Sequence, residues 1–157
     1  MADATGVDWR ADRIGAAERG ENPMVIAWMR SGFAAIGDTQ FLPGYCVLTA
    51  KPRVARLEDL PRAERAVFLE DMGLLGEAVA AACAPLLRVN YSIYGNTDAY
   101  LHAHVFPRYA WEPAERIPGP VWLYPQENWS DATLAYDQAR HGALTRKIAD
   151  TLASMAI

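Results

Sequence analysis

The chain has 157 residues, and 52% of them are hydrophobic, which is enough for one well-buried core and short for two. We therefore expect a single domain over residues 1–157, with a flexible stretch at residues 1–6. Its 15 lysines and arginines are outnumbered by 19 aspartates and glutamates, and the formal net charge is −4. This balance argues against a general DNA- or RNA-binding protein, which needs a basic face to displace counterions. It still permits a phosphate ligand, because amides, histidines and an arginine can create a local positive pocket.

The sequence indicates a cytoplasmic protein that does not span a membrane. Cys46 and Cys83 have no CxxC or zinc-like spacing, so buried free thiols in a reducing compartment are expected. Residues 1–13 have no apolar core of the signal-peptide type. No run approaches the ~20 apolar residues of a membrane span. We expect neither a membrane partner nor a cofactor.

The first third of the chain predicts one helix and three strands. Residues 8–19 are charged and alanine-rich, and they predict a short surface helix with a peripheral role that ends at Gly20. Two apolar runs, residues 24–30 and 33–38, flank a Ser-Gly break and predict a β-hairpin. A third strand is expected over residues 45–51, after a Pro-Gly turn.

Residues 57–83 predict the longest helix of the chain. Asp59 can cap this helix, and Pro61 suits its first turn. Apolar residues recur at helical spacing with charges on the opposite side: Phe68, Met72, Leu75, Val79 and Ala82. This stripe is expected to face the core and not a cofactor.

The remaining elements complete the predicted architecture. Residues 88–94 alternate in strand fashion, whereas residues 111–129 are rich in proline and tryptophan without periodicity. Such a loop is expected to pack on this subunit's cleft or on a partner. A closing helix is expected from about residue 133, with His141 exposed on it and one apolar stripe: Leu144, Ile148, Leu152 and Met155. Together the elements predict an α+β domain with a largely antiparallel sheet.

Two of the three histidines lie two residues apart in a β-prone run. Side chains of a strand alternate between faces, so His102 and His104 should point the same way, together with Tyr100. Imidazole can act near neutral pH as a nucleophile, an acid or a base, so the pair is a candidate active site. From these residues alone, a pair of structural histidines is the alternative.

Residues 95–109 resemble the signature of the histidine triad superfamily, in which a Gly-Gln-Ser/Thr turn precedes a strand with three alternating histidines. His102 falls on the middle histidine and His104 on the last one. The chain departs from the pattern at the first histidine, where Tyr100 stands, and at the centre of the turn, where Asn96 replaces glutamine.

The resemblance implies a five-stranded antiparallel sheet crossed by a helix, usually in a homodimer that acts on nucleotides. His102 would attack the α-phosphorus and form a nucleotidyl-histidine that water then cleaves. His104 would hydrogen-bond a phosphoryl or leaving-group oxygen, and Thr97 would add a hydroxyl near the leaving group. Backbone N–H groups of the turn from Gly95 through Asn96 would face the phosphate. The substrate would be a dinucleoside polyphosphate such as diadenosine tetraphosphate, an adenylated small molecule or a nucleoside phosphoramidate.

Four further residues are expected at the substrate. Asp38 is the nearest match to the family's ribose ligand, and Asn90 would look into the same site from the neighbouring strand. Tyr100 can give and take one hydrogen bond but cannot carry a proton near neutral pH as easily as histidine. The tautomer of the nucleophile is therefore expected to be fixed by Tyr45 or a backbone carbonyl. Arg108 either neutralises a distal phosphate or is a solvated residue at the end of the strand.

Two other functions remain open from the sequence. The histidine pair could hold zinc or iron as an HxH motif, with Asp98, Glu112 or His141 as a third ligand. Alternatively, the protein could bind a nucleotide without turnover, because Tyr100 cannot carry a proton near neutral pH as easily as histidine.

Overall fold

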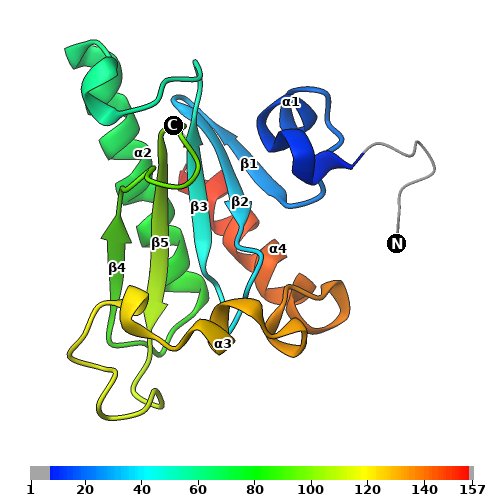
Figure 1. Ribbon diagram of the computed structural model, residues 1–157, viewed down its shortest axis with the longest axis vertical. Helices are drawn as coiled ribbons and strands as arrows, with labels where there is room; N and C mark the ends of the chain where they lie inside the picture. The colour runs from blue at the N-terminus through cyan, green and yellow to red at the C-terminus, as the bar shows by residue number, and fades with distance from the viewer. Residues whose placement is uncertain (1–7, 156–157) are drawn as a thin grey trace.

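The computed structural model describes residues 8–155 and contains a five-stranded antiparallel sheet covered by helices (Figure 1). The strand order is β1-β2-β3-β5-β4. The strands are β1 (Val25–Met29), β2 (Gly32–Ile36), β3 (Cys46–Ala50), β4 (Arg88–Ser92) and β5 (His102–Arg108). The α+β class and the antiparallel sheet expected from the sequence are therefore confirmed. The flexible stretch predicted at residues 1–6 lies outside the described residues.

Helices α2 (Arg62–Ala82) and α4 (Gln138–Met155) lie on one face of the sheet and pack against each other (Figure 1). The apolar stripes of both helices enter the core, where Phe68, Leu75 and Ile148 are fully buried. Leu48 of β3 and Val105 of β5 are also fully buried in this core. Burial of this apolar surface is the main favourable term that holds the helices on the sheet. The opposite face of β5 is therefore left for the histidines.

Helix α2 begins later than the sequence indicated. Pro61 is its N-cap residue, and Asp59 does not cap it. The preceding Leu60 has an extended backbone, as expected for a residue before proline, so no helix can pass through it. Asp59 instead closes the short 3-10 helix η2 (Leu57–Asp59), where its carboxylate accepts from the backbone N–H of Arg56.

The segment after β5 contains more regular structure than its composition indicated. It forms η3 (Val121–Leu123), α3 (Gln126–Ser130) and η4 (Ala132–Leu134) before α4 begins. The chain begins with η1 (Trp9–Asp12) and α1 (Arg13–Glu18), and Gly20 follows α1 with a positive φ of 73°. Within residues 8–155, no helix has the length and apolar character needed to cross a membrane.

Candidate functional site

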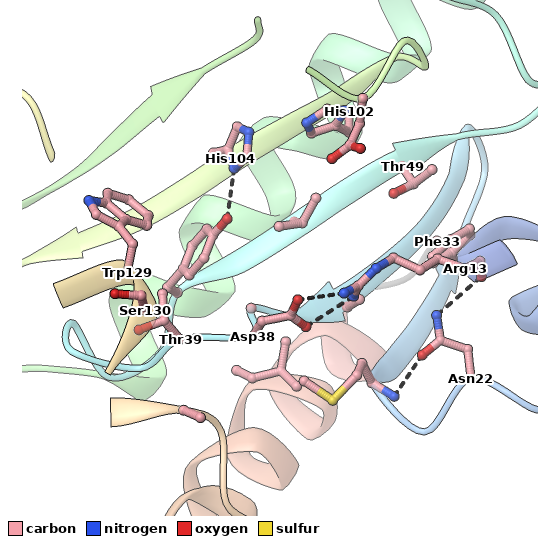
Figure 2. Close-up of a pocket in the computed structure, with 18 of the residues that line it drawn as sticks. Arg13, Asn22, Phe33, Asp38, Thr39, Thr49, His102, His104, Trp129 and Ser130 are labelled. Carbon is pink, nitrogen blue, oxygen red and sulfur yellow. Dashed lines mark hydrogen bonds and ion pairs between the residues drawn. The ribbon is translucent and has the colours of Figure 1, made fainter. Parts of the chain in front are cut away.

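Two adjoining cavities share the histidines of β5 in their lining, and Figure 2 shows the first of them. The first, called the sheet cavity, has a volume of about 450 Å³ and lies over β2 and β3. The second, called the loop cavity, has a volume of about 560 Å³ and is formed with the turn before β5. Four side chains line both cavities: Asp98, His102, His104 and Trp122. The register of β5 against β3, with His102 opposite Thr49 and His104 opposite Val47, fixes this arrangement.

His102 is held by the backbone. Its Nδ1 lies 2.8 Å from the carbonyl oxygen of Tyr100, and the side chain is 7% exposed. A carbonyl oxygen can only accept, so the neutral ring must carry its proton on Nδ1. This assigns the lone pair to Nε2, which is the form that a nucleophilic imidazole requires.

His104 is held by the side chain of Tyr45, which directly precedes β3. Its Nδ1 lies 2.7 Å from the hydroxyl oxygen of Tyr45. Burial raises the pKa of the Tyr45 hydroxyl well above its usual range. Burial and the nearby His102 lower the pKa of His104 to about 3, so its ring is neutral. Tyr45 has no other acceptor among residues 8–155, and its O–H therefore donates to Nδ1 and leaves the proton of His104 on Nε2.

The two histidines consequently offer an acceptor and a donor to one site. Their ring centroids lie 4.8 Å apart, with an angle of 75° between the ring planes. One ring offers a lone pair on Nε2, and the other offers an N–H donor on Nε2. A nucleophile beside a fixed donor is the arrangement that displacement at phosphorus needs.

The turn before β5 forms one wall of the loop cavity. Gly95, Asn96 and Thr97 all line this cavity together with the histidines. Gly95 has a φ of 69°, in the left-handed region that favours glycine. The turn thus brings its residues to the histidine pair, as the sequence pattern indicated.

Asp38 lies in the sheet cavity and is bound by Arg13 of α1 (Figure 2). Arg13 donates from Nη1 to Oδ1 at 3.0 Å and from Nη2 to Oδ2 at 2.5 Å. Ile14 and Ala17 of α1 pack against Phe33 of β2, which holds the helix beside the cavity. The peripheral role predicted for α1 is therefore wrong. The alternation of apolar and charged residues in this segment could have indicated that it packs against the sheet.

The tryptophan-rich segment covers this chain's own cleft. Trp122 and Trp129 stack with ring centroids 5.0 Å apart, and Trp122 stands edge-on to His104 at 4.7 Å. The Trp122 indole N–H donates to Ser92 Oγ at 3.1 Å. Thr39 Oγ1 donates to the carbonyl oxygen of Asn128 at 3.1 Å, which fastens the segment to the rim of the sheet cavity. The sequence had left open whether this segment packs on the cleft or on a partner.

No family model matches the sequence, and no curated protein matches it. Solved structures do match. A histidine triad protein from Sinorhizobium meliloti 1021 superposes with a TM-score of 0.70 at 18% identity, over 92% of this chain and 95% of that one. A histidine triad protein from Marinobacter aquaeolei VT8 gives a TM-score of 0.70 at 20% identity, over 92% and 96%. A hypothetical histidine triad nucleotide-binding protein from Sulfolobus tokodaii strain 7 gives 0.64 at 13%, over 90% and 91%.

The chain has the histidine triad fold. The fold expected from the resemblance is thereby confirmed across most of the chain, including the C-terminal third that matched the pattern less specifically.

Tyr100 marks the departure from the histidine triad pattern. It precedes β5, and its ring centroid lies 4.8 Å from that of His102. Burial and the nearby Asp98 raise the pKa of the Tyr100 hydroxyl. Its backbone carbonyl, and not its side chain, holds the tautomer of His102. Of the two partners expected for the nucleophile, the carbonyl serves His102 and Tyr45 serves His104.

Arg108 and Asn90 line neither the sheet cavity nor the loop cavity. The guanidinium of Arg108 is 4% exposed and pairs with Glu112, with 2.9 Å between Nη2 and Oε2. It also donates to Asn90 Oδ1 at 2.7 Å and to the carbonyl oxygen of Gly119 at 2.8 Å. These bonds use the guanidinium to tie the loop after β5 to the end of the sheet. The substrate contacts predicted for Arg108 and Asn90 do not agree with this placement, and Arg108 is not solvated either.

A third metal ligand does not join the histidine pair within the part of the chain described. No three histidine, cysteine, aspartate or glutamate side chains come together there as a metal site requires. Glu112 is committed to Arg108 and also accepts from the Tyr124 hydroxyl at 2.6 Å. His141 lies on α4, where its Nδ1 accepts from the backbone N–H of Asp137 at 2.9 Å. The HxH alternative lacks support from these residues.

Proposed function

We propose that this protein is a nucleotide phosphohydrolase or nucleotidyl transferase that acts on an α-phosphate through a covalent nucleotidyl-His102. The observation that carries this proposal is the pair of hydrogen bonds that assigns opposite tautomers to the two histidines on one face of β5. The carbonyl of Tyr100 leaves a lone pair on Nε2 of His102. The hydroxyl of Tyr45 leaves a proton on Nε2 of His104.

The reaction would proceed in two displacements. Nε2 of His102 forms an N–P bond as the bond from phosphorus to the leaving oxygen or nitrogen breaks, and the leaving group takes up a proton from solvent, which the attacking water returns in the second displacement. Neutral imidazole is suited to this step because it avoids the repulsion between an anionic nucleophile and the phosphate oxygens. Water then breaks the N–P bond, releases a nucleoside monophosphate and returns the lone pair to His102.

Fixed donors would stabilise the charge that develops on the phosphate oxygens. His104 supplies its Nε2–H, and the turn from Gly95 to Asn96 supplies backbone N–H groups beside the loop cavity. Thr97 adds a hydroxyl for the leaving group. Removal of one such donor typically costs on the order of 10²–10³ in rate.

The nucleoside would occupy the sheet cavity. Phe33, Ala35 and Val47 give this cavity apolar lining, and Asp38 offers a carboxylate to the ribose hydroxyls. Arg13 holds that carboxylate by two hydrogen bonds. An apolar surface with one fixed carboxylate suits a base joined to a ribose. The nucleotide-binding description of the Sulfolobus tokodaii protein supports this assignment.

The substrates we propose are a dinucleoside polyphosphate, such as diadenosine tetraphosphate, or a nucleoside phosphoramidate. Both present an α-phosphorus with a leaving group that could extend into the loop cavity beside Thr97 and Asp98.

We also propose that the protein is a cytoplasmic homodimer. Strand β4 lies at one edge of the sheet, and Leu87 and Tyr91 are exposed there. A second copy would cover these apolar side chains and the open strand edge. Cys46 and Cys83 are buried free thiols, as expected in a reducing compartment. Sedimentation at two protein concentrations tests the dimer, and a monomer at both would contradict it.

Hydrolysis assays test the catalytic proposal. Purified protein should release AMP from diadenosine tetraphosphate or from a fluorogenic adenosine phosphoramidate, with activity that survives a chelator. His102→Ala should abolish this activity, whereas His141→Ala, on α4, should retain it. AMP binding without turnover of any of these substrates would instead favour a non-catalytic nucleotide-binding module.

A further inference from the structure

A third cavity lies beside Tyr100 and shares Thr97 and Asp98 with the loop cavity. It has a volume of about 460 Å³ and is called the arginine cavity here. Three arginines from different segments line it: Arg10 of η1, Arg13 of α1 and Arg53 of the loop after β3. No sequence motif indicates a function for any of these three arginines.

The arginine cavity shares a rim with the candidate active site. Arg13, Asp98 and Tyr100 line both this cavity and the sheet cavity. The Arg53 guanidinium lies over the Tyr100 ring, 5.8 Å from the centroid, and the centroid of the same ring lies 4.8 Å from that of His102. The residue that replaces the first histidine of the triad pattern is therefore the wall between the two spaces.

Arginines outnumber carboxylates three to two among the side chains that line this cavity, and Arg13 is also paired with Asp38. Arg10 lies over the Trp9 ring at 4.3 Å, and within residues 8–155 neither its guanidinium nor that of Arg53 has an ion-pair partner. Two carboxylates, Asp12 and Asp98, also line the cavity. Asp12 already accepts from the backbone N–H of Gly15 at 3.0 Å as the N-cap of α1.

We infer that the arginine cavity binds a phosphate or diphosphate group. Guanidinium groups match the geometry of phosphate oxygens and form paired, charge-assisted hydrogen bonds with them. Arg10 and Arg53 have their side-chain donors available for this, and Arg13 keeps the N–H groups that Asp38 does not use. The group comes either from a free anion or from the distal phosphates of a nucleotide in the sheet cavity. The second source rests on the proposed function, whereas the first does not.

Pyrophosphate binding to the His102→Ala protein tests the site without any turnover. Calorimetry should detect binding, and Arg10→Gln and Arg53→Gln should each weaken it about tenfold, the effect of losing one charge-assisted contact. Arg62→Gln is the matched control. Arg62 is an exposed residue at the start of α2, and its substitution removes the same charge. No binding, or equal weakening by Arg62→Gln, would overturn the inference.

Nucleotide affinities distinguish the two sources. If the distal phosphates of a nucleotide occupy the cavity, ADP binds more tightly than AMP, pyrophosphate competes with ADP, and Arg53→Gln removes the difference. If the group is a free anion, AMP and ADP bind alike and pyrophosphate binds together with either. Absence of hydrolysis in the assays above would disprove the proposed reaction and leave these binding results unchanged.

Discussion

The Nδ1 atom of His102 lies 2.8 Å from the carbonyl oxygen of Tyr100. The backbone thus holds the candidate nucleophile, although the histidine expected at position 100 is absent. A backbone carbonyl cannot titrate, so this hydrogen bond keeps the same polarity at every pH at which the protein is folded. Replacement of the first histidine therefore does not by itself remove the nucleophilic tautomer of His102.

Tyr45→Phe should slow turnover about tenfold, because it removes the hydrogen bond that fixes the proton of His104 on Nε2. The change should appear in kcat more than in KM. Nitrogen-15 NMR should show His104 protonated on Nε2 in the wild-type protein and a mixture of tautomers in the variant. A variant with wild-type kcat, or a wild-type His104 protonated on Nδ1, would contradict this assignment.

Stability should depend on pH through His104. In the unfolded chain this group titrates near pH 6.5, whereas burial and His102 lower its pKa in the folded protein to about 3. Between these values the unfolded chain binds a proton that the folded protein does not bind. The contribution of His104 to the free energy of unfolding should therefore be fully present above about pH 6.5. As the pH falls toward 3, this contribution should decrease by up to about 1.4 kcal/mol per pH unit.

Urea unfolding of the wild-type protein and of His104→Gln, measured between about pH 7 and pH 4, checks this dependence. The variant lacks the titrating group, so its stability should fall less steeply. Parallel curves for the two proteins would show that His104 does not carry the effect.

Arg108→Met should destabilise the protein by about 3–5 kcal/mol, because it leaves the buried Glu112 carboxylate without its partner. At a temperature where the variant remains folded, its KM should stay near the wild-type value, since Arg108 lies outside both cavities. Arg56→Gln provides a comparison, because the Arg56–Asp59 pair is exposed and should contribute little. A large rise in KM with unchanged stability would instead restore the phosphate contact predicted from the sequence.

Asp38→Asn should raise KM about tenfold for ribonucleotide substrates, because a charged acceptor for the ribose hydroxyls is lost. The effect on kcat should be smaller, since Asp38 lines the sheet cavity and not the loop cavity. A substrate with 2′,3′-dideoxyribose should be affected much less by the substitution. Equal effects on both substrates would place the ribose elsewhere.

The sheet and its histidine strand could be predicted from the sequence because their signals are local. Alternation over residues 102–108 and the Ser-Gly break between β1 and β2 determine strand and turn directly. The turn at Gly95 likewise follows from the left-handed backbone that favours glycine.

Contacts between distant segments could not be predicted in the same way. Arg13 and Asp38 are 25 residues apart, and Thr39 and Asn128 are 89 apart. Neither local pattern identifies the partner residue in the distant segment. The burial of Arg108 could not be predicted for the same reason, since it depends on Glu112 and on the loop that folds back over it.

Trapping of the covalent intermediate would establish whether His102 is the nucleophile. Protein mixed with an adenosine phosphoramidate or diadenosine tetraphosphate, quenched at alkaline pH and analysed by mass spectrometry, should carry one AMP on His102. The adduct should be stable to base, labile to acid and absent from His102→Ala. Rapid turnover with no adduct on His102, or an adduct on another residue, would contradict the account.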